Sequence, residues 1–84
     1  MKTLQELGKA VAALRRSLNL KQDTVASRAG ITPESLSRFE RGRAAELGAR
    51  KLLAILAVMG MEIEFSKTGA SGTLDELRRE RGVS

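Results

Sequence analysis

The sequence lacks cysteine and histidine altogether, and these absences exclude several kinds of site. Without cysteine, no disulfide can staple the chain and no thiol can act as a nucleophile or metal ligand. Without histidine, a zinc site would need carboxylates alone, and acid–base chemistry near neutral pH loses its usual side chain. We therefore expect no metal, no cofactor and no enzymatic activity.

Aromatic residues and long apolar runs are also scarce. Phe39 and Phe65 are the only aromatic residues, so the core must be aliphatic, and base stacking on aromatic side chains is not expected. No apolar stretch follows the first six residues, so no signal peptide is expected. The longest apolar stretch, residues 52–61, falls far short of the roughly 20 residues that span a bilayer. A soluble, cytoplasmic protein with no membrane partner is expected.

Positive charge is in excess and is concentrated in the middle of the chain. The 84 residues allow one domain at most and carry a net charge of +5. Nine basic and four acidic residues lie between Arg15 and Lys51, which accounts for the whole surplus. A basic middle segment predicts a polyanion as its partner. The alternative is that the charge serves solubility alone.

The spacing of apolar residues predicts an all-α domain of four helices. Steps of three and four residues place apolar side chains on one face of a helix over residues 4–17. Further helices are expected over residues 21–29, 33–40 and 46–59. The apolar side chains expected on the inner faces are Leu4, Leu7, Val11, Leu14, Leu18, Val25, Ala26, Ala29, Leu36, Phe39, Leu47, Leu52, Leu53, Leu56 and Met59.

The second and third helices are separated by a short turn with clear boundary signals. Gly30 can take the left-handed conformation that closes a helix, and Thr32 followed by Pro33 is typical of a helix start. Ala26 is small where the two helices must approach each other. Two short helices joined by a three-residue turn with glycine predict a helix-turn-helix over residues 22–39.

The outer face of the third helix is available to a DNA groove. Because Leu36 and Phe39 face the core, the opposite face is left with polar and charged residues. Arg38 can bind guanine O6 and N7 with two hydrogen bonds, or can be a solvated charge. The candidate base-reading residues on this face are Pro33, Glu34, Ser37 and Arg38.

Residues 20–43 resemble the signature of the Xre/Cro, or lambda-repressor-like, helix-turn-helix family. The resemblance rests on the pattern Gln-xxx-Ala-xxx-Gly, which ends at Gly30, and on the pattern Ser-Arg-x-Glu-x-Gly, which ends at Gly42. It implies a DNA-binding transcriptional regulator whose third helix reads bases. It also implies an ion pair between Arg15 and Glu40 that ties the first helix to the third.

The same resemblance implies contacts with the DNA backbone on either side of the base-reading face. Gln22 resembles a glutamine that binds a backbone phosphate. Pro33 and Glu34 depart from the family, which often has amide side chains there. Glu34 can accept from cytosine N4, or it can be a favourable charge at a helix N-terminus, and both remain open. The candidate phosphate-binding residues are Lys21, Gln22, Thr32, Ser35, Arg41 and Arg43.

Residues 61–65 alternate strictly between apolar and acidic side chains, which predicts a short half-buried strand. No other segment alternates in this way, so the strand would have two open edges. We expect it to pair with a second copy across a twofold axis, with Met61, Ile63 and Phe65 in the dimer interface. A dimer suits a palindromic operator in double-stranded DNA. The alternative is that these residues cover the core of a monomer.

The predicted organisation is a DNA-binding domain over residues 1–66 and a flexible tail over residues 67–84, with a short charged helix at 74–81. Four helices, a strand and a tail resemble the HipB-like antitoxins. That resemblance implies an autoregulating antitoxin of a HipBA-like system, associated with the nucleoid and bound by a HipA-like kinase toxin. The alternative is a stand-alone Xre-family regulator. An enzyme is not expected, because Glu62 and Glu64 have no metal partner or nucleophile beside them.

Overall fold

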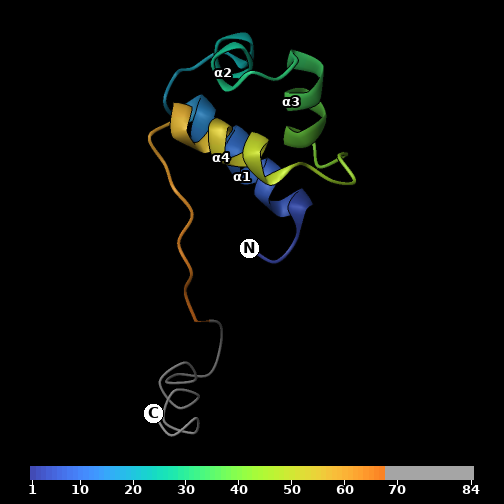
Figure 1. The fold of residues 1–84 in the computed structure, drawn as a ribbon, viewed down its shortest axis with the longest axis vertical. Helices are drawn as coiled ribbons and strands as arrows, with labels where there is room; N and C mark the ends of the chain where they lie inside the picture. Colours follow the sequence, from blue (N-terminus) through green and yellow to red (C-terminus); the bar gives the residue numbers. More distant parts are fainter. Residues whose placement is uncertain (68–84) are drawn as a thin grey trace, which may run out of the picture.

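The computed structural model describes residues 1–67 and folds them into four helices (Figure 1). These are α1 (Leu4–Ser17), α2 (Gln22–Ala29), α3 (Pro33–Glu40) and α4 (Ala49–Val58). The prediction of an all-α domain is confirmed, and residues 1–67 of this single chain contain no strand. The predicted tail lies outside the described residues apart from Lys67. No helix within residues 1–67 is long and apolar enough to cross a membrane.

The N-terminus of α1 is capped by the side chain of Thr3. The hydroxyl of Thr3 accepts a hydrogen bond from the Glu6 backbone N–H at 3.0 Å, which satisfies one of the free donors in the first turn. The Glu6 carboxylate accepts from the backbone N–H of Lys2 at 3.4 Å. The capping pattern seen in the sequence therefore sets the start of α1.

The turn between α2 and α3 has the predicted form. Gly30 is left-handed with φ +75°, and the N–H of Ile31 donates to the carbonyl of Ala26 at 3.0 Å. The Thr32 hydroxyl accepts from the backbone N–H of Ser35 at 3.1 Å, and Pro33 is the first residue of α3. These interactions hold α3 at a fixed angle to α2.

Helix α4 begins three residues later than the sequence indicates. The expected start was Glu46, whereas the helix begins at Ala49 after Gly48 in an extended conformation. The preceding loop must carry the chain from the end of α3 across to α4, and it is anchored on the way. Ala44 is buried, and its carbonyl accepts from Gln5 Nε2 of α1 at 3.2 Å.

The apolar face of α4 also differs from the expectation at two positions. Leu53 is 50% exposed, whereas Ile55, which the sequence reading left out, is completely buried. The buried residues Ile55, Leu56 and Met59 are spaced as neighbours on one side of a helix. Leu53 lies outside that stripe because each residue rotates by about 100° around the axis.

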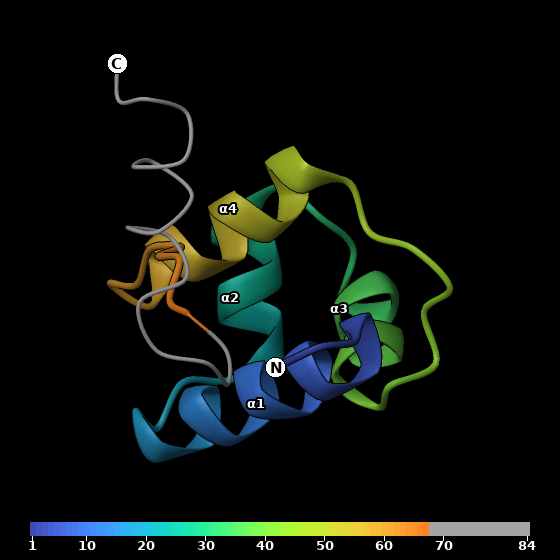
Figure 2. The same cartoon turned by 90° about the horizontal axis from the view of Figure 1, so that it is seen from below.

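The core lies where α1, α2, α3 and α4 meet (Figure 2). Its largest fully buried side chains are Phe39, Leu36, Ile55 and Val25, and the predicted burial of Leu36 and Phe39 is confirmed. Gly8 of α1 lies against the backbone of α3, where an added Cβ would clash with the Phe39 carbonyl oxygen. Gly8 therefore allows α1 and α3 to approach closely.

Candidate nucleic-acid interface

The outer face of α3 is largely exposed in the part of the chain that the structure describes. Leu36 and Phe39 point into the core, while Pro33, Glu34 and Arg38 on the other side are exposed and Ser37 is half-buried. The eight residues of α3 form a helix about 12 Å long at 1.5 Å per residue. A helix with one free polar face can enter the major groove of DNA. The structure thus brings the four candidate base-reading residues onto one helix.

The candidate phosphate-binding residues lie at the two ends of α3 and at the start of α2. Thr32 is exposed, and because its oxygen accepts a bond as the N-cap, its own O–H proton is still available for donation. Arg41 and Arg43 are exposed just after α3, and Lys21 is exposed just before α2. Cations and donors therefore flank the polar face of α3 on both sides.

A cleft of about 350 Å³ lies beside α3, against the loop that leads to α4. Ser35 and Arg38 line it from α3, Lys51 from α4, and Glu46 from the loop. Figure 2 shows this loop running outward beside α3. In the sequence, Lys51 contributes to the basic surplus, and no other pattern singles it out. The structure adds Lys51 to the cations near Arg38.

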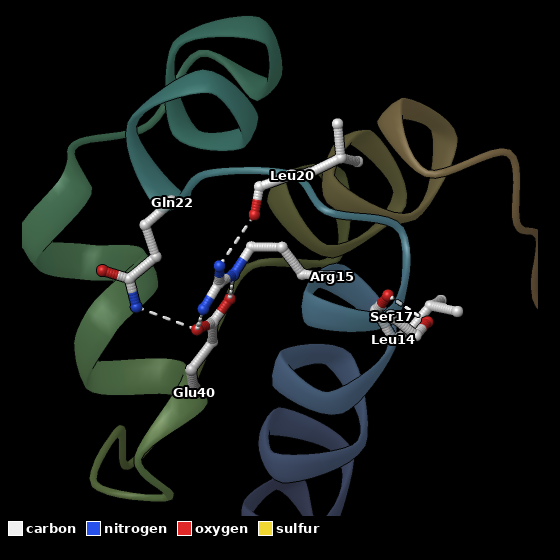
Figure 3. Close-up of polar contacts among 6 residues, drawn as sticks. All are labelled: Leu14, Arg15, Ser17, Leu20, Gln22 and Glu40. Carbon is white, nitrogen blue, oxygen red and sulfur yellow. Dashed lines mark hydrogen bonds and ion pairs between the residues drawn. The ribbon is translucent and has the colours of Figure 1, made fainter.

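A buried polar network joins the end of α1, the start of α2 and the end of α3 (Figure 3). Arg15 donates from Nε and Nη2 to the two carboxylate oxygens of Glu40, at 2.7 and 2.9 Å. Its third donor, Nη1, binds the carbonyl of Leu20 at 2.9 Å. The two side chains are only 10% and 1% exposed. The structure thus brings Arg15 and Glu40 together as a two-bond ion pair.

This arrangement favours the charged form of Arg15. The hydrogen bonds to Glu40 raise the pKa of Arg15 above its ordinary value, burial acts in the opposite direction, and the charge of Glu40 raises it further. Every buried side-chain nitrogen and oxygen in the described part of the chain has a hydrogen-bond partner. No buried polar atom of the network is therefore left without a partner, which a buried ion pair requires if it is to stabilise a fold.

Gln22 is a member of this network, which the sequence reading did not anticipate. Its Nε2 donates to Glu40 Oε1 at 2.8 Å, while its amide oxygen points away from Glu40 (Figure 3). An amide nitrogen carries two N–H groups, so one donor is left for another partner. The phosphate contact expected of Gln22 stays a prediction, and Glu40 now provides a reason for the orientation of its amide.

Residues 11–65 match a protein family described as helix-turn-helix, which covers more than half of the chain and includes α2, α3 and α4. The chain belongs to this Xre/lambda-repressor-like helix-turn-helix family. Membership supports a DNA-binding transcriptional regulator. Neither a curated protein nor a solved structure matched the sequence.

In this helix-turn-helix protein, the residues expected at a dimer interface are uncovered. Met61 is 47% exposed, Ile63 is 46% exposed and Phe65 is 97% exposed. The alternative that all three cover the core of a monomer fails for Phe65, which covers nothing within the described residues. Their contact with a second copy stays a prediction.

The helix-turn-helix domain offers no obvious place for a metal within residues 1–67. No group of three or more Asp, Glu, His or Cys side chains is clustered there. Glu62 and Glu64 lie on the segment after α4 and along the edge of an apolar groove. Around α3, the described surface offers hydrogen bonding and positive charge.

Proposed function

We propose that this helix-turn-helix protein is a sequence-specific transcriptional repressor that binds a palindromic operator as a dimer. The observation that carries the proposal is the free face of α3, flanked by exposed cations and held to α1 and α2 by the buried pair of Arg15 and Glu40. A recognition helix that is fixed to its domain in this way can present the same side chains at every operator.

Each group of residues has a separate task in this proposal. Contacts from Lys21, Gln22, Arg41 and other flanking residues to phosphates supply affinity that falls as salt rises. Arg38 reads guanine in the major groove, and Pro33 offers shape and apolar contact to a thymine methyl group. Occlusion of a promoter by the bound dimer then prevents transcription at the nucleoid.

Selection from a pool of random DNA duplexes tests this function directly. The full chain should enrich a consensus with two related half-sites, and its affinity for that consensus should fall steeply between low and moderate salt. As a control, Arg16→Ala, which removes an exposed arginine of α1 outside α3, should enrich the same consensus. Failure to enrich any sequence, with equal binding to all duplexes, would contradict sequence-specific repression.

We further propose an antitoxin role as the specific form of this repression. The support is the layout in which four helices are followed by the exposed residues Met61, Ile63 and Phe65 and then by a charged segment. In this form the protein represses its own operon and binds a HipA-like kinase toxin, without a cofactor or enzymatic activity of its own. The alternative is a stand-alone Xre-family regulator with no toxin partner.

A nuclease-treated pull-down of the tagged full chain from its native host separates these two forms. A stoichiometric protein partner with a kinase fold, encoded beside this gene, is the result that the antitoxin role predicts. Retention of DNA before nuclease treatment, with no protein partner afterwards, would leave the stand-alone regulator.

A further inference from the structure

An apolar groove of about 650 Å³ runs along α1 on the side that faces α4. We call it the α1–α4 groove. Leu4, Leu7 and Leu14 line it from α1, and Leu52 and Leu56 line it from α4. Its volume is comparable to that of pockets that enclose small apolar ligands.

The segment after α4 borders this groove and has unused hydrogen-bonding capacity. The N–H of Met61 donates to the carbonyl of Leu56 at 2.8 Å, and residues 62–66 form no hydrogen bond with any described residue. The segment runs as an extended chain away from the helices in Figure 1. Its open backbone groups and alternating side chains are suited to pairing with another strand.

We propose that the α1–α4 groove receives Phe65 of a second copy, in a dimer whose 61–65 segments pair antiparallel with Ile63 opposite Ile63. The inference rests on the dimerisation stated under the proposed function and adds the register and the receiving surface. In this register Met61 of each copy lies opposite Phe65 of the other. All three apolar side chains then have apolar neighbours across the twofold axis.

In the neighbouring registers, some apolar side chains of the segment lose their apolar partners within it. A twofold axis at Glu62 would leave Phe65 opposite Met59 at the end of α4, and an axis at Glu64 would place Met61 opposite Lys67. Only an axis at Ile63 keeps every apolar residue of the segment paired within it. The 61–65 segment is thus complementary to itself, and this favours a second copy of the chain as the occupant of the α1–α4 groove.

The register brings Phe65 to the groove. Met61 lines the α1–α4 groove, and residues directly opposite each other in an antiparallel pair have Cβ atoms about 5 Å apart. The ring of Phe65 from the second copy is therefore delivered to the mouth of the groove beside Met61. Each copy would complete the apolar surface of the other.

The same register has an unfavourable feature that makes it testable. Glu62 of each copy lies opposite Glu64 of the other, which places like charges together at two symmetry-related positions. Reversing one of the two charges should convert both repulsive pairs into attractive ones. Reversing both charges should restore repulsion, now between lysines.

Sedimentation equilibrium of the full chain, without DNA, tests the register. Glu62→Lys and Glu64→Lys should each lower the dimer Kd about tenfold, the gain should shrink in high salt, and the double reversal should return the Kd to that of the parent. With an axis at Glu62 or Glu64, each glutamate would face either the same residue of the other copy or an uncharged residue, so neither single reversal would lower the Kd. That outcome would overturn the register while leaving dimerisation intact.

Fluorescence tests the receiving groove, because the chain contains no tryptophan or tyrosine. The emission of Phe65→Trp should shift to shorter wavelength as the protein concentration rises through the dimer Kd. Leu4→Gln at the groove should weaken that shift, and Leu53→Gln, at an exposed position on α4, should leave it unchanged. A dimer whose tryptophan emits as in water would overturn the groove assignment, and a monomer at all concentrations would overturn the dimer itself.

Discussion

Arg15 of α1 and Glu40, the last residue of α3, form an ion pair with two hydrogen bonds of 2.7 and 2.9 Å inside the domain. Gln22 adds a third hydrogen bond to the same carboxylate. One side chain thus connects three helices, and it does so at the end of the helix that we assign to DNA recognition. The angle at which α3 is presented therefore depends on this carboxylate.

Removal of the Glu40 carboxylate should destabilise the fold strongly. Glu40→Ala leaves Arg15 buried without its counter-charge, and we expect a loss of about 3–5 kcal/mol in the free energy of unfolding. Urea denaturation followed by circular dichroism measures the difference. Glu46→Ala removes an exposed carboxylate from the loop before α4 and should change stability by less than about 0.5 kcal/mol. Similar effects of the two substitutions would contradict the structural role of Glu40.

The contribution of the Arg15–Glu40 pair to the free energy of unfolding should not depend on pH between neutral and mildly alkaline conditions. The pKa of Arg15 is raised in the folded state, so the stability it contributes is complete below its unfolded pKa and is lost only when the pH rises through the higher folded value. Both values lie far above neutrality. The difference in unfolding free energy between the parent and the double variant Arg15→Met/Glu40→Leu, which removes both charges, should stay constant from about pH 7 to about pH 9. A steady change of that difference over this range would show that another group titrates with the pair.

Gly8 should tolerate no side chain, although it lies in the middle of a helix. Gly8→Ala would normally favour a helix by about 0.5–1 kcal/mol, but the new Cβ would meet the Phe39 carbonyl oxygen. We expect destabilisation of about 3 kcal/mol because α1 and α3 must separate. Ala13→Gly, at an exposed position of the same helix, makes the reverse change and should cost about 1 kcal/mol. Stabilisation by Gly8→Ala would show that the two helices do not cross so closely.

Ile63→Asp should convert dimers into monomers. The substitution would place two carboxylates opposite each other at the twofold axis, in surroundings that are otherwise apolar. Light scattering on a size-exclusion column gives the mass in solution. Leu53→Asp alters a side chain with similar exposure on α4, 50% against 46%, and should leave the mass unchanged. An unchanged mass for Ile63→Asp would remove the case for pairing through residues 61–65.

The sequence predicted the helices and the helix-turn-helix because local signals specify them. Gly30, Thr32 and Pro33 each impose a backbone conformation that depends on neighbouring residues alone. The predicted start of α4 was wrong because the true start depends on a tertiary contact, the hydrogen bond from the Gln5 side chain to the carbonyl of Ala44. Leu53 and Ile55 were misjudged because α4 is apolar around most of its circumference, so packing against the other helices decides which side is buried.

The candidate site also contains some residues that local sequence predicts and others that only the tertiary fold reveals. Residues of the outer face of α3 follow from helical spacing once Leu36 and Phe39 are assigned to the core. The hydrogen bond from Gln22 to Glu40 and the place of Lys51 beside Arg38 require the fold, because each joins residues from different helices. The glycine in the middle of α1 was a signal that went unused, since an isolated glycine in a helical pattern often marks a close approach.

The most direct test of the account is the effect of Arg38→Ala on binding to the selected operator and to unrelated duplexes at one salt concentration. If α3 reads bases, the variant should lose about 1–3 kcal/mol per half-site on the operator and much less on unrelated DNA, so that specificity falls. An equal loss on all duplexes would show that Arg38 binds phosphate. Unchanged binding to the operator would contradict the assignment of α3 as the recognition helix.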